Sequence, residues 1–130
     1  MLPKVKRLRD RLISFCKIVG IDLVVTSEFR SSAEQDKLYA QGRATPGNIV
    51  TNARGGESMH NYGIAFDVAI NRNGKYDYNI TPFIGWLGEF IGLEWGGRWS
   101  NFKDVNHFQY TCGYTLGQLK NGDIDLTKFL

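Results

Sequence analysis

Hydrophobic and polar residues recur along this chain with two periods, one close to a helical turn and one of two residues. Near the start, apolar residues at helical spacing form one stripe: Val5, Leu8, Leu12, Phe15 and Val19. Pro3 suits the first turn of a helix and Gly20 suits its end. The pattern predicts a helix over residues 3–19, with Cys16 beside the stripe as a small buried apolar residue.

Strict alternation predicts three strands, over residues 22–30, 64–70 and 106–110. In the second stretch the apolar side chains that share one face would point into a core: Ile64, Phe66, Val68 and Ile70. Asp67 then lies on the other face between two alanines, which leave room for an ion and a substrate. In the third stretch, His107 and Gln109 share one face.

Capping and turn residues place further elements. Ser31 or Ser32 can cap a helix that closes near Gly42. Residues 43–57 are rich in glycine and polar side chains, and they predict a loop that forms a wall of a cleft. Residues 114–130 predict a short helix and a docked tail.

Asn73-Gly74 predicts a tight hairpin after the second strand. A calcium loop at the same place is disfavoured, because Ala69 and Ile80 occupy the positions where acidic ligands are needed. A further helix is predicted over residues 81–92. Its apolar stripe is expected to pack in the core: Phe83, Trp86, Leu87 and Phe90.

These elements follow one another without an internal repeat or linker, so they predict a single domain over residues 1–130. The expected class is α+β, a small antiparallel sheet with packed helices. A hydrophobic content of 42% is typical of a globular fold, and we expect a monomer. A net charge of +3 without a basic stripe interleaved with aromatics argues against nucleic-acid binding.

No apolar run approaches the ~20 residues of a membrane span, so no stable membrane insertion is expected. Residues 1–9 are charged and have no apolar core segment, so they do not resemble a secretory signal. The sequence therefore predicts synthesis in the cytoplasm. That origin disfavours a disulfide between Cys16 and Cys112.

The candidate chemistry centres on the only two histidines, His60 and His107. Asp67 follows His60 by seven residues, and Gly63 between them allows a sharp bend. Two imidazoles, one carboxylate and an open fourth position suit a catalytic Zn²⁺. A helical His-Glu-x-x-His pair is absent, so these ligands have to converge through the tertiary structure. The spacing alone leaves a plain structural role for each histidine open.

Three ordered motifs resemble those of the zinc peptidases that cleave peptidoglycan stem peptides. They are Ser-x-His-x-x-Gly-x-Ala-x-Asp over residues 58–67, Trp-Gly-Gly over 95–97 and Asp-x-x-His-Phe-Gln over 104–109. The resemblance covers most of the chain, from about residue 26 to residue 109. Residues 34–43 and 60–63 are similar to the L-alanyl-D-glutamate endopeptidases of phage endolysins.

This resemblance implies the hedgehog/DD-peptidase fold and one Zn²⁺ per chain, held by His60, Asp67 and His107. It also implies that Asp104 is the catalytic base, at a position where the carboxypeptidases usually have Glu, and that Arg30 lies in the active-site pocket. Glu28 and Glu94 are alternative bases. The candidate substrate-binding residues are Gln35, Ser58, Tyr62, Gln109 and Trp95, the last of which could instead fill the core.

The implied function is hydrolysis of the peptidoglycan stem peptide at the L-Ala-D-Glu bond. Two alternatives stay open: a D-Ala-D-Ala carboxypeptidase or dipeptidase, and a non-catalytic module of the same fold that binds zinc or a ligand. By analogy with phage endolysins, the protein would wait in the cytoplasm until a holin opens the membrane and would then lyse the host cell. The net charge of +3 could help it adsorb to anionic wall polymers.

Overall fold

The computed structural model describes residues 1–130. Its α-helices are α1 (Pro3–Ile18), α2 (Ser32–Ala40), α3 (Pro82–Phe90) and α4 (Leu116–Asn121). Its strands are β1 (Leu23–Ser27), β2 (Ala65–Arg72), β3 (Lys75–Asp77), β4 (Glu94–Trp95) and β5 (His107–Gln109). Three 3₁₀ helices complete it: η1 (Met59–Tyr62), η2 (Gly96–Arg98) and η3 (Leu126–Phe129). None of the helices combines the length and the apolar character needed to cross a membrane.

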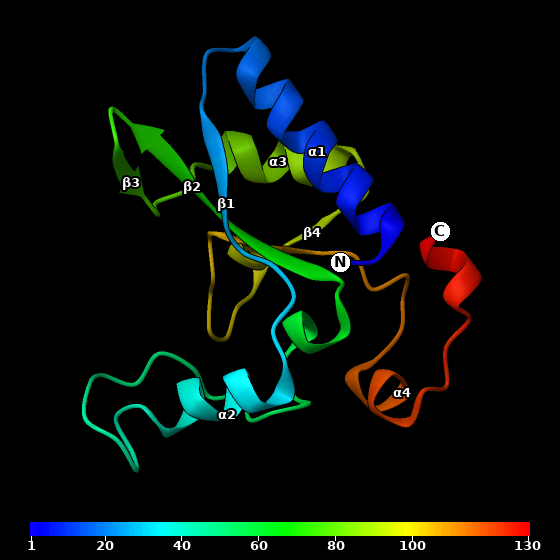
Figure 1. The fold of residues 1–130 in the computed structure, drawn as a ribbon. Helices are drawn as coiled ribbons and strands as arrows, with labels where there is room; N and C mark the ends of the chain where they lie inside the picture. Colours follow the sequence, from blue (N-terminus) through cyan, green and yellow to red (C-terminus); the bar gives the residue numbers. More distant parts are fainter.

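Strand β2 is the centre of a five-stranded sheet with the order β1-β2-β5-β4, and β3 pairs with β2 at one end. All pairings are antiparallel, which confirms the predicted α+β class. Helices α1 and α3 lie side by side, whereas α2 and the long loop after it lie apart from them (Figure 1). The β2–β3 hairpin turns at Asn73 and Gly74, whose φ angles of 55° and 87° fit a type I′ turn.

The alternation of β2 divides core from site, as the sequence predicts. Phe66 and Val68 are fully buried and belong to the core cluster with α1 and α3 residues. Asp67 lies between them on the opposite face, where its side chain keeps 18% exposure. The flanking Ala65 and Ala69 are themselves fully buried, so the opening is confined to Asp67.

Helix α1 covers the core with Val5, Leu8, Leu12 and Cys16. The predicted stripe is correct for its first part and wrong at its end, because Phe15 is 37% and Val19 54% exposed. Cys16 occupies the inward position instead. Its burial raises the pKa of the thiol to about 11, and both cysteines of the chain are free.

Helix α3 packs through a different face from the one predicted. Phe83, Trp86 and Phe90 are 45%, 55% and 86% exposed, so the expected aromatic core stripe is wrong. The buried face consists of Ile84, Gly85 and Gly88. Cβ atoms added to the two glycines would overlap the rings of Trp95 and Phe108. The helix lies this close to β4 and β5 because these glycines have no side chains.

Strand β1 ends at Ser27, earlier than the predicted 22–30, because its pairing with β2 shifts between Val25 and Ser27. Such a bulge bends the strand and re-aims the residues beyond it. The chain therefore leaves the sheet at Glu28 and runs toward η1, where it contributes to the candidate site.

Candidate active site

His60 is positioned by η1, which is fixed at both ends. The Ser58 hydroxyl accepts a hydrogen bond from the His60 backbone N–H, and Gly63 ends the turn with a left-handed φ of 70°. Asn61 ties the turn to two other segments, because its side chain accepts from Gly56 N–H and donates to the Arg30 carbonyl. This anchoring holds His60, which is 4% exposed, next to the start of β2.

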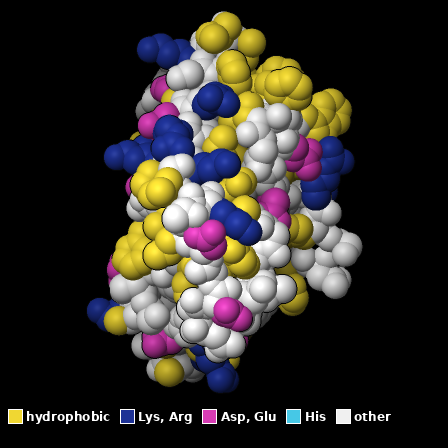
Figure 2. All heavy atoms as spheres, turned by 90° about the vertical axis from the view of Figure 1, so that its right-hand side faces the viewer, with side chains coloured by type: hydrophobic (Ala, Val, Ile, Leu, Met, Phe, Trp, Pro, Cys, Tyr) yellow, Lys and Arg dark blue, Asp and Glu magenta, His cyan; other side chains and the backbone are white.

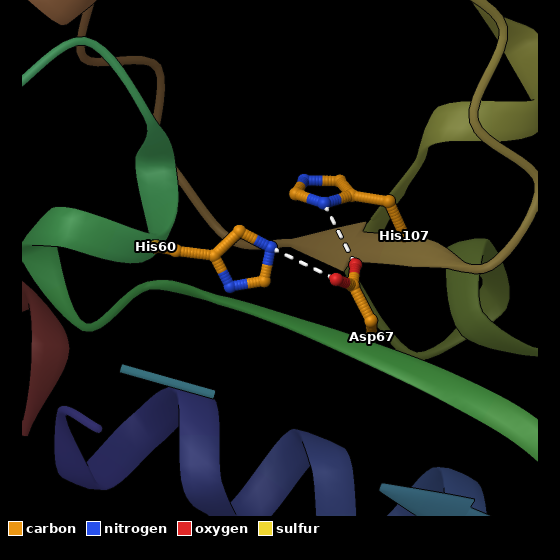
Figure 3. A group of neighbouring side chains, drawn as sticks. All are labelled: His60, Asp67 and His107. Atoms are coloured by element: carbon orange, nitrogen blue, oxygen red, sulfur yellow. Dashed lines mark hydrogen bonds and ion pairs between the residues drawn. The ribbon is translucent and has the colours of Figure 1, made fainter. Parts of the chain in front are cut away.

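Asp67 and His107 meet through the register of β2 and β5. The two residues are direct partners across the antiparallel pair, so their side chains share one face. Asp67 Oδ1 lies 3.2 Å from His107 Nδ1, and Asp67 Oδ2 lies 3.3 Å from His60 Nε2. Figure 3 shows both rings directed at the carboxylate from different elements. The structure thus brings together the three residues that the sequence suggested as metal ligands.

The second nitrogen of each ring has its own partner. His60 Nδ1 lies 2.7 Å from the Glu28 carbonyl oxygen, an acceptor only, so Nδ1 carries the proton. His107 Nε2 lies 2.8 Å from Gln109 Oε1, which favours a proton on Nε2. These contacts leave His60 Nε2 and His107 Nδ1 to face Asp67, so these two nitrogens are the ones available to a metal once they have lost their protons. Second partners of this kind orient the histidine ligands of metals.

The donor set fits zinc. Ligands at the ~2.0–2.1 Å of Zn–N and Zn–O bonds stand about 3.3 Å apart around a tetrahedral ion, close to the separations of Asp67 from the two rings. One ligand atom from each of His60, Asp67 and His107 lies within 4.8 Å of the other two. Three ligands leave a fourth position open, as in catalytic zinc sites.

The electrostatics of the site follow from burial and pairing. Burial alone would raise the pKa of Asp67, but the hydrogen bonds and charges of His107 and His60 hold it well below its usual range. Burial would lower the pKa of His107, and Asp67 outweighs that effect and raises it. A metal ion that binds His107 would therefore compete with a proton on its ring.

A cleft of about 1200 Å³ opens over the three side chains. Asp104 lines it, with Oδ2 4.0 Å from His107 Nδ1 and 47% of its side chain exposed. Burial, together with the charge of Asp67, raises the pKa of Asp104 despite the two nearby histidines. Arg30 also lines the cleft, where its guanidinium donates to Gln35 Oε1 at 2.8 Å and to Ser27 Oγ at 2.9 Å.

The Trp95-Gly96-Gly97 motif has a packing explanation. A Cβ on Gly96 would overlap the Asp104 carbonyl, and one on Gly97 would overlap the Trp95 ring. The backbone N–H of Asp104 donates to the Gly96 carbonyl at 3.0 Å. The two glycines thus allow the loop that carries Asp104 to lie against β4, next to the metal ligands.

The other candidate substrate-binding residues have different positions. Ser58 and Gln109 line the cleft, whereas Gln35, Tyr62 and Trp95 do not. Trp95 is a core residue, 5% exposed, which donates from Nε1 to the Val105 carbonyl. Gln35 is fully buried and holds Arg30 and the Ala53 carbonyl, and the Tyr62 hydroxyl donates to the Gly56 carbonyl. Gln35 and Tyr62 therefore anchor the walls of the cleft.

Neither alternative base reaches the cleft. Glu28 pairs with Arg9, and Glu94 accepts hydrogen bonds from the backbone and hydroxyl of Thr111. Two residues of the site were not singled out from the sequence. Asn61 fixes η1 through its hydrogen bond to the Arg30 carbonyl. Trp99 lines the cleft, and its ring centroid lies 5.1 Å from that of His107. A polar residue inside a histidine motif was the available signal for Asn61; Trp99 had none beyond its aromatic type.

Comparison with known proteins places this geometry in a family. The family model for D-alanyl-D-alanine carboxypeptidase, of the M15 peptidases, matches residues 51–110, which include all three metal-ligand candidates and Asp104. The peptidoglycan L-alanyl-D-glutamate endopeptidase CwlK of Bacillus subtilis is 45% identical over 119 residues, which cover 82% of this chain and 71% of CwlK. The chain belongs to the M15 peptidase family. M15 peptidases are zinc-dependent, in agreement with the donor set of this peptidase.

Solved structures share the fold of this M15 peptidase. The L-Ala D-Glu endopeptidase ChiX of Serratia marcescens aligns with a TM-score of 0.55 and 23% identity, over 84% of this chain and 86% of ChiX. The vancomycin-resistance D,D-pentapeptidase VanY, in complex with Zn(II), aligns with a TM-score of 0.63 and 14% identity, over 96% of this chain and 80% of VanY.

Proposed function

We propose that this M15 peptidase is a zinc-dependent peptidoglycan hydrolase that cleaves the stem peptide at the L-Ala-D-Glu bond. The observation that carries the proposal is one cleft with two imidazoles and a carboxylate at zinc spacing and a second carboxylate, Asp104, beside them. The choice of bond is supported by the 45% identity to CwlK, an L-alanyl-D-glutamate endopeptidase. Residues 1–130 act as a single catalytic domain in this proposal.

His60, Asp67 and His107 would hold one Zn²⁺, through His60 Nε2, an Asp67 oxygen and His107 Nδ1. When bound, zinc supplies a Lewis acid that lowers the pKa of water to about 7 and polarises the scissile carbonyl. Gln109 and the Glu28 carbonyl keep the two rings in the required tautomers.

Asp104 is the proposed general base. Its Oδ2 lies 4.0 Å from His107 Nδ1, and Asp104 is not among the three residues whose ligand atoms all lie within 4.8 Å of one another, which supports a role beside the metal. In its ionised form the carboxylate accepts the proton of the attacking water, and it later returns that proton to the leaving amine. Its half-exposed position in the cleft leaves room for both water and substrate.

Arg30 is proposed to stabilise the oxyanion that develops on the scissile carbonyl. Gln35 and Ser27 accept hydrogen bonds from the Nη1 and Nη2 of Arg30, which fixes the direction of its remaining N–H donors before substrate arrives. A donor held in advance costs no reorganisation during the reaction. Ser58 and Gln109, at the wall of the cleft, are placed to contact the peptide.

The test is mass spectrometry of purified sacculi digested with the zinc-loaded protein. New N-terminal D-Glu and free L-Ala carboxyl ends are expected. Release of terminal D-Ala would assign the protein to the carboxypeptidases named by the family model. Hydrolysis of the free dipeptide D-Ala-D-Ala to D-Ala, tested in parallel, would make it a dipeptidase. Zinc binding with neither new termini nor hydrolysis of D-Ala-D-Ala would support the non-catalytic alternative.

A phage endolysin role with holin-dependent release is a second part of the proposal, and it rests on the sequence alone. Expression in the bacterial cytosol should then be tolerated, and permeabilising the inner membrane should cause lysis. Rapid lysis with an intact membrane would contradict it. The expected monomer is checked in the same preparation by light scattering.

A further inference from the structure

Charge is unevenly distributed between helix α1 and the rest of the chain. The helix holds six Lys or Arg residues and one Asp, a net charge of +5. The remainder holds ten basic and twelve acidic residues, a net charge of −2, so the modest total of +3 hides the segregation. The excess of positive charge on α1 would attract a polyanion to this helix.

Four of the six cations are exposed: Lys6, Arg7, Arg11 and Lys17. The side chains of Lys6, Arg11 and Lys17 make no hydrogen bond or ion pair and are free to meet a partner, whereas Arg7 donates to the Leu130 carbonyl. The other two are engaged within the protein, since Arg9 pairs with Asp10 and Glu28, and Lys4 lies over the Tyr110 ring. Figure 2 shows Lys and Arg side chains gathered in the upper half of the face that includes α1.

The stability of the helix does not explain this arrangement. The first turn of α1 contains no acidic residue, although acids are the favoured charges near a helix N-terminus. Lys6 and Arg7 stand close to that positive end. Arg7 and Arg11 are also four residues apart, a spacing at which like charges repel.

The positions of the cations match a linear partner. With a rise of about 1.5 Å per residue, Lys6, Arg11 and Lys17 extend over roughly 16 Å along the helix. A single phosphate would contact one of them, whereas an extended chain of phosphates would contact several. Insertion into a bilayer is disfavoured, because the apolar face of α1 is already buried in the core.

We propose that the outer face of α1 binds a linear phosphodiester polymer of the bacterial cell wall and so holds the enzyme on its substrate. The choice of a wall polymer rests on the proposed function. No α1 residue lines the catalytic cleft, whose own charges are mixed: Arg30 and Lys103 against Glu57, Asp67 and Asp104. A polymer bound on α1 would therefore leave the cleft open.

The test variant replaces Lys6, Arg11 and Lys17 by Gln, which retains a good helix propensity. The matched control replaces Lys37, Lys75 and Lys120 by Gln; these exposed lysines lie outside α1, and their loss changes the net charge equally. The ligand is purified poly(glycerol phosphate), titrated by calorimetry at several salt concentrations. The α1 variant should bind at least about tenfold more weakly and with a shallower salt dependence, and the control within about twofold of wild type.

Two further measurements separate the possible results. Cleavage of a soluble muropeptide should be equal in all three proteins, and its absence would contradict the proposed function without affecting the binding result. Sacculi that carry the polymer should be cleaved more slowly by the α1 variant, and stripped sacculi at the same rate. Equal losses of affinity in the α1 variant and the control would show that binding depends on net charge and not on the cations of α1, and would overturn the proposal. Binding to anionic vesicles, or to DNA, with no binding to poly(glycerol phosphate), would also overturn the proposal.

Discussion

The two faces of strand β2 place different demands on neighbouring residues. On one face, Phe66 and Val68 are fully buried under α1 and α3, and Phe66 stacks on Phe108 with ring centroids 5.8 Å apart. On the other face, Asp67 stands opposite His107 and opens to the cleft. One strand thus contributes to both the core and the candidate metal centre, through side chains that do not touch the same partners.

The two faces of β2 assign stability and activity to different side chains. Side chains on the helix face contribute through burial and close packing. Those on the cleft face are polar, largely buried and fixed by hydrogen bonds, and they contribute the proposed chemistry. Substitutions on the cleft face should therefore change zinc binding or turnover, whereas substitutions on the helix face should change the free energy of unfolding.

The largest effect is expected for His60→Ala, which removes one of three proposed ligands. Zinc and hydrolysis should be lost together, as measured by elemental analysis and muropeptide cleavage. At a free zinc concentration of 1,000 times Kd, zinc binding raises the free energy of unfolding of the wild-type protein by about 4 kcal/mol. A chelator should therefore lower its Tm. The variant should show no such response. Stoichiometric zinc at wild-type affinity in the variant would remove His60 from the ligand set.

Asp104→Asn should come next, with zinc retained and turnover reduced by ~10²–10⁴-fold. The amide has nearly the same shape, so Tm should change little, but it cannot accept the proton of the water. A marked loss of zinc would instead make Asp104 a ligand. Near-wild-type turnover in a zinc-loaded variant would end its role as base.

Gln109→Leu tests the partner of His107 on the cleft face. Without the Oε1 acceptor, His107 loses the contact that places its proton on Nε2, and zinc affinity should fall by ~10–100-fold. Gln109→Glu keeps an acceptor and is the matched control. The readouts are competition with a chelator and the NMR tautomer of His107, recorded without metal at a pH where the ring is neutral. An unchanged affinity and tautomer in Gln109→Leu would limit Gln109 to substrate contact.

Gly88→Ala probes the helix face. The added Cβ would lie 2.5 Å from the Phe108 ring, and such overpacking costs about 1–3 kcal/mol. Zinc content and turnover of the folded fraction should stay at the wild-type level. Gly117→Ala in α4 is the control, because its Cβ would meet nothing closer than 3.8 Å and should be neutral or stabilising by up to ~1 kcal/mol. An equal effect of the two substitutions on chemical denaturation would contradict the close approach of α3.

The sequence predicted β2 and its two faces because a strand has a fixed period of two. The same rule identified the shared face of His107 and Gln109 on β5. The convergence of these residues with His60 was suggested by family motifs and not by periodicity. The bulge in β1 that brings the Glu28 carbonyl to His60 leaves no signal in the pattern, because a backbone acceptor is present in every residue.

Helix α3 shows where periodicity misleads. The pattern identified the most hydrophobic stripe and assigned it to the core, but the close packing is made by glycines, which a hydrophobicity pattern cannot weigh. For Trp95 the sequence left open whether the ring lines the substrate site or fills the core, and in the structure the ring fills the space over Gly85. The small volume of Gly85 and Gly88 on α3 determines both the face through which the helix packs and the position of Trp95.

The smallest effect is expected on the outer side of α3, where the sequence predicted core. Phe90 is 86% exposed, so Phe90→Ser should change the free energy of unfolding by about 0.5 kcal/mol or less. A buried Phe would cost ~3–5 kcal/mol on truncation, as expected for Phe108→Ala under the same helix. Chemical denaturation of both variants beside wild type distinguishes the two environments. A loss of several kcal/mol in Phe90→Ser would restore the predicted stripe and contradict the packing of α3 through Gly85 and Gly88.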